Sequence, residues 1–484
     1  MACRKAALFS TLSVFVVVVG CSGDDQEQDA GKKQGSEGAP CYPNDTCDKG
    51  LVCLSSTCVK LPDAGQPDLP TSDLEMMDSA NDVMVNDASW DAAKKCKTNT
   101  DCDDLLACTT DICSIAGCTN VLIGAFCLIG NTCYAASTPH PSEPCKKCDP
   151  AQDAYAWSKY SCVVTIAGSS NGFLDGPALT SKFYNPSGID VHISGEVYVA
   201  DRQNSRVRVL AGGMVTTYAG SGSTPGFLDG PASTAVFNNP GDLAIDTAGN
   251  VYVADTNNNR VRLISGGVVS TYAGSGTFGF ADGPVTSAKF SWPSGIAVGS
   301  SGDVYVSDPV NYRIRVISAG QVTTLAGSGN LGFLDGPAAS AMFDSPAGIA
   351  VDSSGKVYVA DALNHRIRLI AGGQVSTLAG SGPTGISATG GFLDGPASSA
   401  MFKTPGDVAV DSSGKVYVAD SGNNRIRVIS NNIVSTLAGS GSAGFADGPV
   451  TTATFDYPHS IAVDSSGNVY VADSSNDRIR LIVP

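Results

Sequence analysis

A unit of about 53 residues that occurs six times between residues 163 and 484 constrains the fold of this chain more than any other feature. Each copy contains short runs rich in Val, Ile and Tyr, separated by Gly, Ser and Asn, which is the pattern of short β-strands joined by turns. Four such runs per copy and a near-constant period predict either a β-propeller or a solenoid. In the clearest copy the runs are 349–351, 357–360, 367–370 and 375–379.

The two ends of the repeat region predict that the repeats close into a ring. The sixth copy stops after its third strand, and the missing fourth strand precedes the first full copy, at 163–168. These two segments can pair in one blade, which closes the ring and leaves only short sheet edges. A solenoid would carry polar caps at its ends, and no such caps are visible. The sequence therefore predicts an all-β fold with a six-bladed β-propeller at 163–484.

Three motifs in each copy resemble those of NHL repeats. They read Pro-x-Gly-Ile-Ala-Val-Asp, Gly-x-Val-Tyr-Val-Ala-Asp and Asn-x-Arg-Ile-Arg, and one full set lies within 346–368. The resemblance covers 163–484 and implies the same propeller fold. It implies no single function, because NHL repeats occur in enzymes, RNA-binding proteins and protein-binding modules.

The N-terminus has the features of an export signal at residues 1–20. Arg4 and Lys5 precede an apolar run that is shorter than a membrane-spanning helix requires, and the alternative is an uncleaved membrane anchor. The Gly20-Cys21 pair resembles the bacterial lipoprotein box, which implies cleavage before Cys21 and acylation of its thiol. By the same resemblance, Ser22 favours the outer membrane. We therefore expect an exported protein that is lipid-anchored at the bacterial outer membrane or cell surface.

Small cysteine-rich modules and linkers are expected between the signal and the propeller. Two of the 16 cysteines, Cys3 and Cys21, lie in the signal and at the lipid site, which leaves 14, none after Cys162. An even set in an exported chain predicts disulfides, although their connectivity cannot be read. Cys145-Lys-Lys-Cys148 lacks a second CxxC motif, so we favour disulfides over a zinc or redox site. The expected segments are an acidic tether at 21–40, a small Cys-rich module at 41–60, an acidic disordered linker at 61–95 and a Cys-rich module at 96–162.

The net charge of the protein limits the classes of partner that we expect it to bind. The chain has a formal charge of −16, whereas nucleic-acid-binding proteins need clustered basic surface. We therefore expect no nucleic-acid partner, and we expect membrane attachment through the acyl chains rather than through basic side chains.

Charged and aromatic residues that recur in every copy are predicted to be structural. We expect Asp361 to form a cross-strand ion pair with Arg366, and Arg368 to lay its stem along the sheet. In the Asp-Gly-Pro motif, Asp335 is expected to cap a short helical turn. Phe343 is expected to anchor the following loop on the sheet.

Candidate ligand-binding residues lie where the six copies differ. The copies differ mainly in the connections between the second and third strands and between blades, and strand order places both on one face. Trp and Tyr offer large contact area and are enriched in binding hot spots. The alternative is that these side chains only pack the loops. We predict eight ligand-binding residues: Trp292, Tyr312, Tyr457, His365, His459, Asp242, Asp407 and Asp190.

Three carboxylates in this set are expected at the central channel. Asp242 and Asp407 replace small residues after the first-strand Pro, in blades that lie opposite each other, and Asp190 replaces an inner-strand Ala. They would form a site for a cation or a polar ligand, with solvated acids as the simpler interpretation. No cofactor is required, and calcium is the alternative ligand of these carboxylates.

The sequence favours a lipid-anchored cell-envelope protein whose propeller is a binding platform for protein, peptide or glycan. The alternative is a metal-dependent propeller hydrolase or lyase acting at the central channel, and a third candidate is a purely structural envelope component. The enzyme is less favoured because the chain has four His, whereas a zinc site needs convergent His. No Ser lies in a nucleophile elbow with a matching His, so no catalytic residue is predicted.

Overall fold

The computed structural model describes residues 145–484, apart from 223 and 383–388, and short stretches between 52 and 141. The chain forms two compact units, Met1–Ala80 and Asn81–Pro484, which are described separately. The predicted signal peptide, the lipid site Cys21, and the linkers at 21–40 and 61–95 lie outside the described residues. The described short stretches are 52–54, 57–59, 106, 109–114, 117–122, 126–129, 132–138 and 140–141.

Short antiparallel hairpins account for the strands described before the propeller. In the first unit, β1 (Val52–Leu54) pairs with β2 (Thr57–Val59). In the second unit, three hairpins follow one another along the chain. Their strands are β3 (Thr109–Ser114), β4 (Gly117–Leu122), β5 (Phe126–Ile129), β6 (Thr132–Ala135), β7 (Lys146–Asp149) and β8 (Asp153–Lys159).

Two disulfides connect these hairpins and the start of the propeller. Cys127 bonds to Cys148, Cys145 bonds to Cys162, and Cys133 is also disulfide-bonded. The prediction of disulfides is thus confirmed for these cysteines. The two cysteines of the CxxC motif have different partners, so this motif forms neither a dithiol redox pair nor a zinc site.

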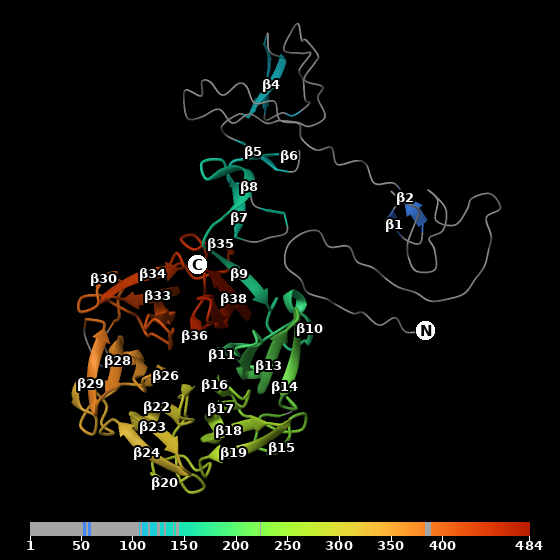
Figure 1. Cartoon of the computed structure of the whole chain (residues 1–484). Coiled ribbons are helices and arrows are strands. Elements are labelled where there is room, and N and C mark those ends of the chain that lie inside the picture. Colours follow the sequence, from blue (N-terminus) through green and yellow to red (C-terminus); the bar gives the residue numbers. More distant parts are fainter. Residues whose placement is uncertain are drawn as a thin grey trace, which may run out of the picture. The chain divides into compact units, whose positions relative to one another are not determined.

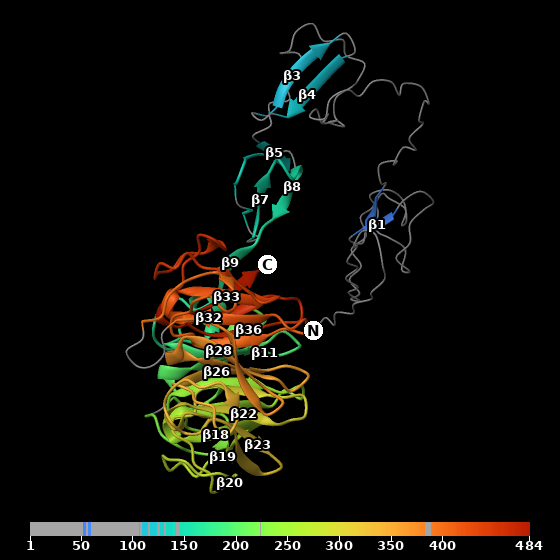
Figure 2. The same cartoon turned by 90° about the vertical axis from the view of Figure 1, so that its left-hand side faces the viewer.

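Six five-stranded sheets are arranged around a common axis, which confirms the predicted six-bladed propeller (Figure 1). Figure 2 shows the same sheets from the side. The first three blades comprise β10 (Gly176–Pro177), β11 (Pro186–Val191), β12 (Val197–Asp201), β13 (Arg206–Ala211) and β14 (Met214–Ala219); β15 (Gly230–Pro231), β16 (Pro240–Ile245), β17 (Val251–Asp255), β18 (Arg260–Ser265) and β19 (Val268–Ala273); and β20 (Gly283–Pro284), β21 (Ile296–Val298), β22 (Val304–Asp308), β23 (Arg313–Ser318) and β24 (Gln321–Ala326).

The last blade contains strands from both ends of the repeat region. Its order is β35-β9-β38-β37-β36, with Val163 opposite Ile482, so the predicted closure of the ring is confirmed. The last three blades comprise β25 (Gly336–Pro337), β26 (Pro346–Val351), β27 (Val357–Asp361), β28 (Arg366–Ala371) and β29 (Gln374–Ala379); β30 (Gly395–Pro396), β31 (Asp407–Val410), β32 (Val416–Asp420), β33 (Arg425–Ser430) and β34 (Ile433–Ala438); and β35 (Gly448–Pro449), β36 (Pro458–Val463), β37 (Val469–Asp473), β38 (Arg478–Val483) and β9 (Cys162–Ala167).

A single 3-10 turn joins the second and third strands of every blade. A further turn, η2 (Ala178–Thr180), follows β10. The joining turns are η3 (Arg202–Asn204), η4 (Thr256–Asn258), η5 (Pro309–Asn311), η6 (Ala362–Asn364), η7 (Ser421–Asn423) and η8 (Ser474–Asn476).

The hydrophobic core lies between neighbouring blades. Each of its six clusters combines side chains from two adjacent sheets. Both faces of a sheet are therefore covered, and every residue of β32, from Val416 to Asp420, is buried. Phe343 is fully buried, as expected for a residue that anchors its loop on the sheet.

The buried ion pairs of each blade use the second Arg of the motif, not the first as predicted. Arg368 is fully buried, and its Nη1 donates to Asp361 Oδ2 at 2.6 Å. Its Nη2 donates to Asp335 Oδ1 at 2.6 Å, and backbone carbonyls accept the remaining N–H groups. Asp361 and Arg366 are opposite each other in the register, but Arg368 is the diagonal neighbour and its long side chain reaches back to the carboxylate.

One further expectation about this network was wrong. Asp335 does not cap a helical turn; its Oδ2 accepts from the backbone N–H and the hydroxyl of Thr377, which joins the outer two-residue strand to the sheet. Arg366 donates to the carbonyls of Asn364 and Gly382 at 2.9 and 2.8 Å, and its guanidinium stacks on Phe333. The same contacts recur around the ring, so these residues stabilise the fold.

Candidate functional site

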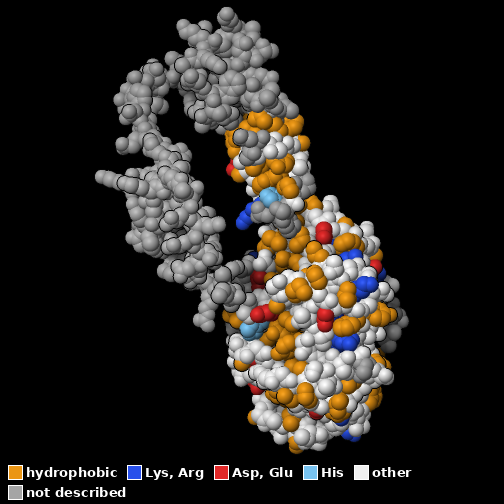
Figure 3. Space-filling view, turned by 90° about the vertical axis from the view of Figure 1, so that its right-hand side faces the viewer, with side chains coloured by type: hydrophobic (Ala, Val, Ile, Leu, Met, Phe, Trp, Pro, Cys, Tyr) orange, Lys and Arg blue, Asp and Glu red, His pale blue; other side chains and the backbone are white. Residues whose placement is uncertain are grey.

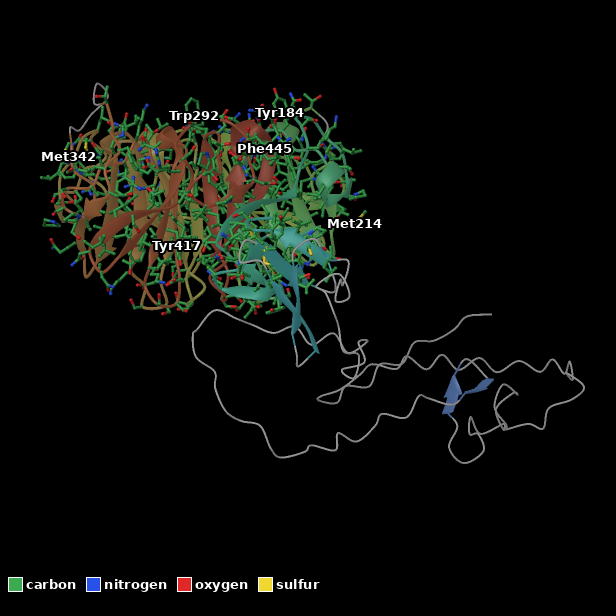
Figure 4. The ribbon with its side chains drawn as sticks, turned by 90° about the horizontal axis from the view of Figure 1, so that it is seen from above. Tyr184, Met214, Trp292, Met342, Tyr417 and Phe445 are labelled. Atoms are coloured by element: carbon green, nitrogen blue, oxygen red, sulfur yellow. A yellow bond between two sulfur atoms is a disulfide. The ribbon has the colours of Figure 1, made fainter. Side chains whose placement is uncertain are left out.

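The strand topology separates two faces of the propeller. The turns η3 to η8 and the first and last residues of each connection between blades lie on one face, which we call the loop face, and the hairpin turns after the first and third strands lie on the other. Figure 4 shows Trp292 and Tyr184 at one face and Tyr417 toward the opposite face. The chain enters the propeller at Cys162, which pairs with Val483 at the hairpin-turn end of β9. The loop face is therefore opposite the point of entry.

Two rings of residues on the loop face have left-handed backbone geometry. One ring precedes the first-strand Pro and the other precedes the first Arg of the third strand, with φ between 43° and 56°. Such angles are uncommon for residues other than Gly, so the surrounding structure must hold each residue in place. The rings contain Asn185, Asn239, Trp292, Ser345, Thr404 and Tyr457, and Ser205, Asn259, Tyr312, His365, Asn424 and Asp477.

Hydrogen bonds between these rings join neighbouring blades at four of the six junctions. The side chain that precedes the Arg accepts from the backbone N–H that precedes the Pro of the next blade. Much of the variation that sequence analysis assigned to ligand binding therefore serves these junctions. The pairs are Trp292 N to Asn259 Oδ1 at 3.1 Å, Thr404 N to His365 Nδ1 at 3.0 Å, Tyr457 N to Asn424 Oδ1 at 2.9 Å, and Asn185 N to Asp477 Oδ1 at 2.8 Å.

The predicted aromatic residues differ in how far they reach solvent. Trp292 is 53% exposed and Tyr457 is 44% exposed, whereas Tyr312 is half-buried and His365 is buried. Phe278 is 54% exposed and lies edge-on to Trp292, with 6.1 Å between ring centroids. Sequence analysis missed Phe278, although it is the one aromatic residue at its position in the six loops.

Asp190, Asp242 and Asp407 line the central channel together with the first strands of all six blades. The channel encloses about 170 Å³. Each carboxylate accepts a hydrogen bond from the backbone of the next blade, so each also joins two blades. The donors are Ile245 N to Asp190 at 2.8 Å, Ile296 N to Asp242 at 3.1 Å, and Ile461 N to Asp407 at 3.0 Å.

Burial in the channel raises the pKa values of these three carboxylates. Burial raises the pKa of Asp190 to about 6 and the pKa of Asp407 to about 7. Burial, together with repulsion from Asp407, raises the pKa of Asp242 well above its ordinary range. Asp242 and Asp407 therefore influence each other across the channel, as expected for opposite blades. These groups can hold protons near neutral pH and exchange hydrogen bonds with a polar ligand.

His459 is the residue after the first-strand Pro of the last blade and lies at the same end of the channel. Its Nδ1 is 2.8 Å from the carbonyl oxygen of Ser187 in the first blade. Burial, and to a smaller extent the charge of Arg202, lower the pKa of the imidazole. The ring is therefore neutral at physiological pH, and it lies 6.2 Å from the ring of Tyr457.

Metal ligation finds no support in the geometry of these side chains. Among the described residues, no group of three or more His, Cys, Asp and Glu side chains is placed to hold a metal ion.

No helix in the described part of the chain has the length and apolarity of a membrane span. On the side of the molecule shown in Figure 3, Lys and Arg side chains are scattered among hydrophobic and uncharged ones.

The six sheets form a β-propeller, and the first strand of each blade lines its central channel. All six blades match the model of the NHL repeat, so the region 183–480 is an NHL-repeat propeller. The matched residues are 183–210, 237–262, 290–317, 343–368, 402–429 and 455–480.

Curated relatives share the repeats over part of their length. The chain is 32% identical over 289 residues to the protein SUPPRESSOR OF QUENCHING 1, chloroplastic, of Arabidopsis thaliana, covering 54% of this chain and 26% of that protein. It is 29% identical over 331 residues to NHL repeat-containing protein 2 of Bos taurus, covering 60% of this chain and 45% of that protein. The chain thus spans less than half the length of these relatives.

Solved structures show the same fold at low sequence identity. An auxiliary nutrient binding protein from Bacteroides thetaiotaomicron aligns with a TM-score of 0.53 and 14% identity, over 78% of this chain and 88% of that one. Its counterpart from Bacteroides ovatus aligns with a TM-score of 0.52 and 16% identity, over the same shares of the two chains. At such identity the likeness is one of fold.

Proposed function

We propose that this protein is a lipid-anchored component of the bacterial cell envelope whose propeller binds a protein, peptide or glycan on the loop face. The observation that carries the proposal is the pair formed by Trp292 and Phe278. These rings are more than half exposed, adjacent, and found in one blade only. Large exposed aromatic side chains that the fold does not need are typical of binding hot spots.

The rigidity of the loop face supports binding as well. The backbone N–H of Trp292 is held by Asn259 of the neighbouring blade, so the indole is presented by a fixed backbone rather than by a free loop. Binding to a preorganised surface costs little conformational entropy. The two nutrient-binding proteins from Bacteroides show that this fold serves binding elsewhere, but their ligands are not transferred to this chain.

Substitution of Trp292 tests the proposal. The purified full-length protein is assayed on a glycan array and against envelope proteins, and Trp292→Ala is expected to lower the captured signal at least tenfold, as for a hot-spot residue. Ile433→Ala is the matched control, because this side chain is 47% exposed at the hairpin-turn end of β34. Equal capture by wild type and Trp292→Ala would remove the basis for assigning the site here. The melting temperature of each variant verifies that it folds.

The hydrolase or lyase is not proposed. The channel carboxylates accept hydrogen bonds from backbone N–H groups of neighbouring blades, and the described residues contain no metal-binding group. The predicted calcium alternative therefore has no geometric support of its own.

A further inference from the structure

Arg202 is a half-buried cation whose Nε has no hydrogen-bond partner in the described part of the chain. It is the first residue of η3 in the first blade, its Nε is buried without a hydrogen-bond partner, and its charge acts on Tyr457 and His459 of the last blade. It forms no ion pair with any described carboxylate, and burial lowers its pKa. A buried guanidinium normally has its donors satisfied, because leaving them unpaired is costly.

No other blade has a charged residue at the position of Arg202. The small or apolar residues found there include three hydroxyls that donate to the Pro carbonyl of the next blade, those of Thr256 at 2.8 Å, Ser421 at 2.6 Å and Ser474. Arg202 makes no such contact, so its guanidinium does not bond to the next blade. The equivalent residues are Thr256, Pro309, Ala362, Ser421 and Ser474.

The other groups at this junction complete a polar site beside Arg202. The Ser187 carbonyl can only accept, so Nδ1 of His459 must carry the proton, and Nε2 is left as an acceptor. The ring of Tyr457 lies 6.2 Å from that imidazole and is 44% exposed. The Asp477 carboxylate, at the same junction, accepts instead from the backbone N–H of Asn185. A donor fork, a neutral acceptor and a flat aromatic surface therefore lie together on the loop face.

We propose that Arg202, His459 and Tyr457 bind a hydroxylated carboxylate, of the kind found in the uronic acid residues of acidic glycans. The planar guanidinium matches a carboxylate with two parallel hydrogen bonds. A hydroxyl of the ligand donates to Nε2 of His459, and the apolar face of the sugar ring lies on Tyr457. A phosphate ion would satisfy Arg202 but has no apolar ring face to lie on Tyr457. This inference rests on the proposed binding role of the loop face, and it names the class of ligand.

Titration of the full-length protein with D-glucuronate tests this site, with D-glucose and inorganic phosphate as comparison ligands. We expect glucuronate to bind at least tenfold more tightly than either of them. Arg202→Gln should lower the glucuronate affinity about tenfold or more, as expected for loss of a hydrogen bond to a charged group. Lys415→Gln is the matched control, because it removes the same charge from an exposed residue in the turn between β31 and β32, and it should bind like wild type.

Thermal unfolding without ligand separates binding from a structural role. Because Nε of Arg202 has no hydrogen-bond partner in the described part of the chain, Arg202→Gln should melt at the same temperature as wild type or higher, and only wild type should be stabilised by glucuronate. A lower melting temperature of the unliganded variant, or equal affinity for glucuronate and phosphate, would overturn the inference. If glucuronate fails to bind while capture still depends on Trp292, this site is wrong and the proposed function stands.

Discussion

Residues at equivalent positions of the six blades, and residues close together on one strand, have different structural roles although their backbones are alike. Arg366 and Arg368 are two positions apart on one strand, yet only Arg368 is fully buried and paired with two carboxylates. Before the first Arg, Asn259 bonds to the next blade, whereas Tyr312 is a half-buried aromatic residue. The side chains and backbone groups that the fold brings against each residue decide its role.

The channel carboxylates give a residue-scale prediction of pH dependence. The pKa of Asp407 in the folded protein is about 7, above its ordinary value of 3.8, so folding favours the protonated form. The stabilisation is therefore complete below about pH 4 and is lost as the pH rises through about 7. We expect the stability of wild type to fall between about pH 4 and pH 7 more steeply than that of Asp407→Asn, by about 1.4 kcal/mol per unit of pKa shift.

Thermal unfolding across this pH range, measured on both proteins, checks the prediction. Asp190→Asn is a companion variant with the same expected sign over a lower range, because the pKa of Asp190 is about 6. Parallel pH profiles for wild type and Asp407→Asn would show that this carboxyl does not titrate as expected.

Each blade is an element that cannot cover its own surface. Its two faces are covered by the neighbouring blades, so the junctions carry the apolar clusters as well as polar contacts. The second and third blades are joined by Thr256 Oγ1 to the Pro293 carbonyl and by Asn259 to the backbone of Trp292. At the junction between the first and second blades, Ser205 Oγ is buried and has no hydrogen-bond partner.

These two junctions give a matched pair of variants at the element scale. Asn259→Gly keeps the left-handed backbone accessible but leaves the Trp292 N–H without its acceptor, so the free energy of unfolding should fall by about 1 kcal/mol. Ser205→Gly removes an unpaired hydroxyl at the same ring position and relieves backbone strain, so it should be neutral or stabilising. Chemical denaturation of both variants measures the difference, and equal losses would contradict the role of Asn259.

The whole molecule is organised by the closure of the ring and by the point at which the chain enters it. The closing strand β9 lies between β35 and β38, and its first residue, Cys162, is bonded to Cys145. The disulfide ties the preceding segment to the hairpin-turn end of this strand. The loop face is at the other end of the same strands, so the chain enters the propeller on the side away from that face.

Lipid anchoring gives the prediction at the scale of the whole molecule. Replacement of the acyl-accepting thiol in Cys21→Ser should abolish palmitate labelling and release the protein from the membrane fraction. Binding by the loop face should be unchanged, because Cys21 precedes the propeller by more than a hundred residues. Membrane retention of an unlabelled Cys21→Ser variant would contradict a lipid anchor and favour an uncleaved signal.

Local patterns in the sequence were enough to predict the fold and its closure. The strand runs and the turn residues recur at each period, and the sixth copy lacks its fourth strand, so the pairing of β9 with β38 followed from counting repeats. The channel location of Asp242 and Asp407 followed from the same symmetry. Burial of Phe343 was predictable because a large apolar residue next to a sheet lowers its free energy by leaving water.

Only the tertiary structure decided what the variable residues contact. The choice of Arg368 over Arg366 depends on which guanidinium the connection before the same blade covers, and the role of Asn259 depends on a backbone N–H 33 residues further along the chain. Phe278 and Arg202 became candidates for the same reason, because exposure and an unpaired donor exist only in the folded protein. Periodicity constrains what the blades have in common, whereas packing between blades sets what makes each one different.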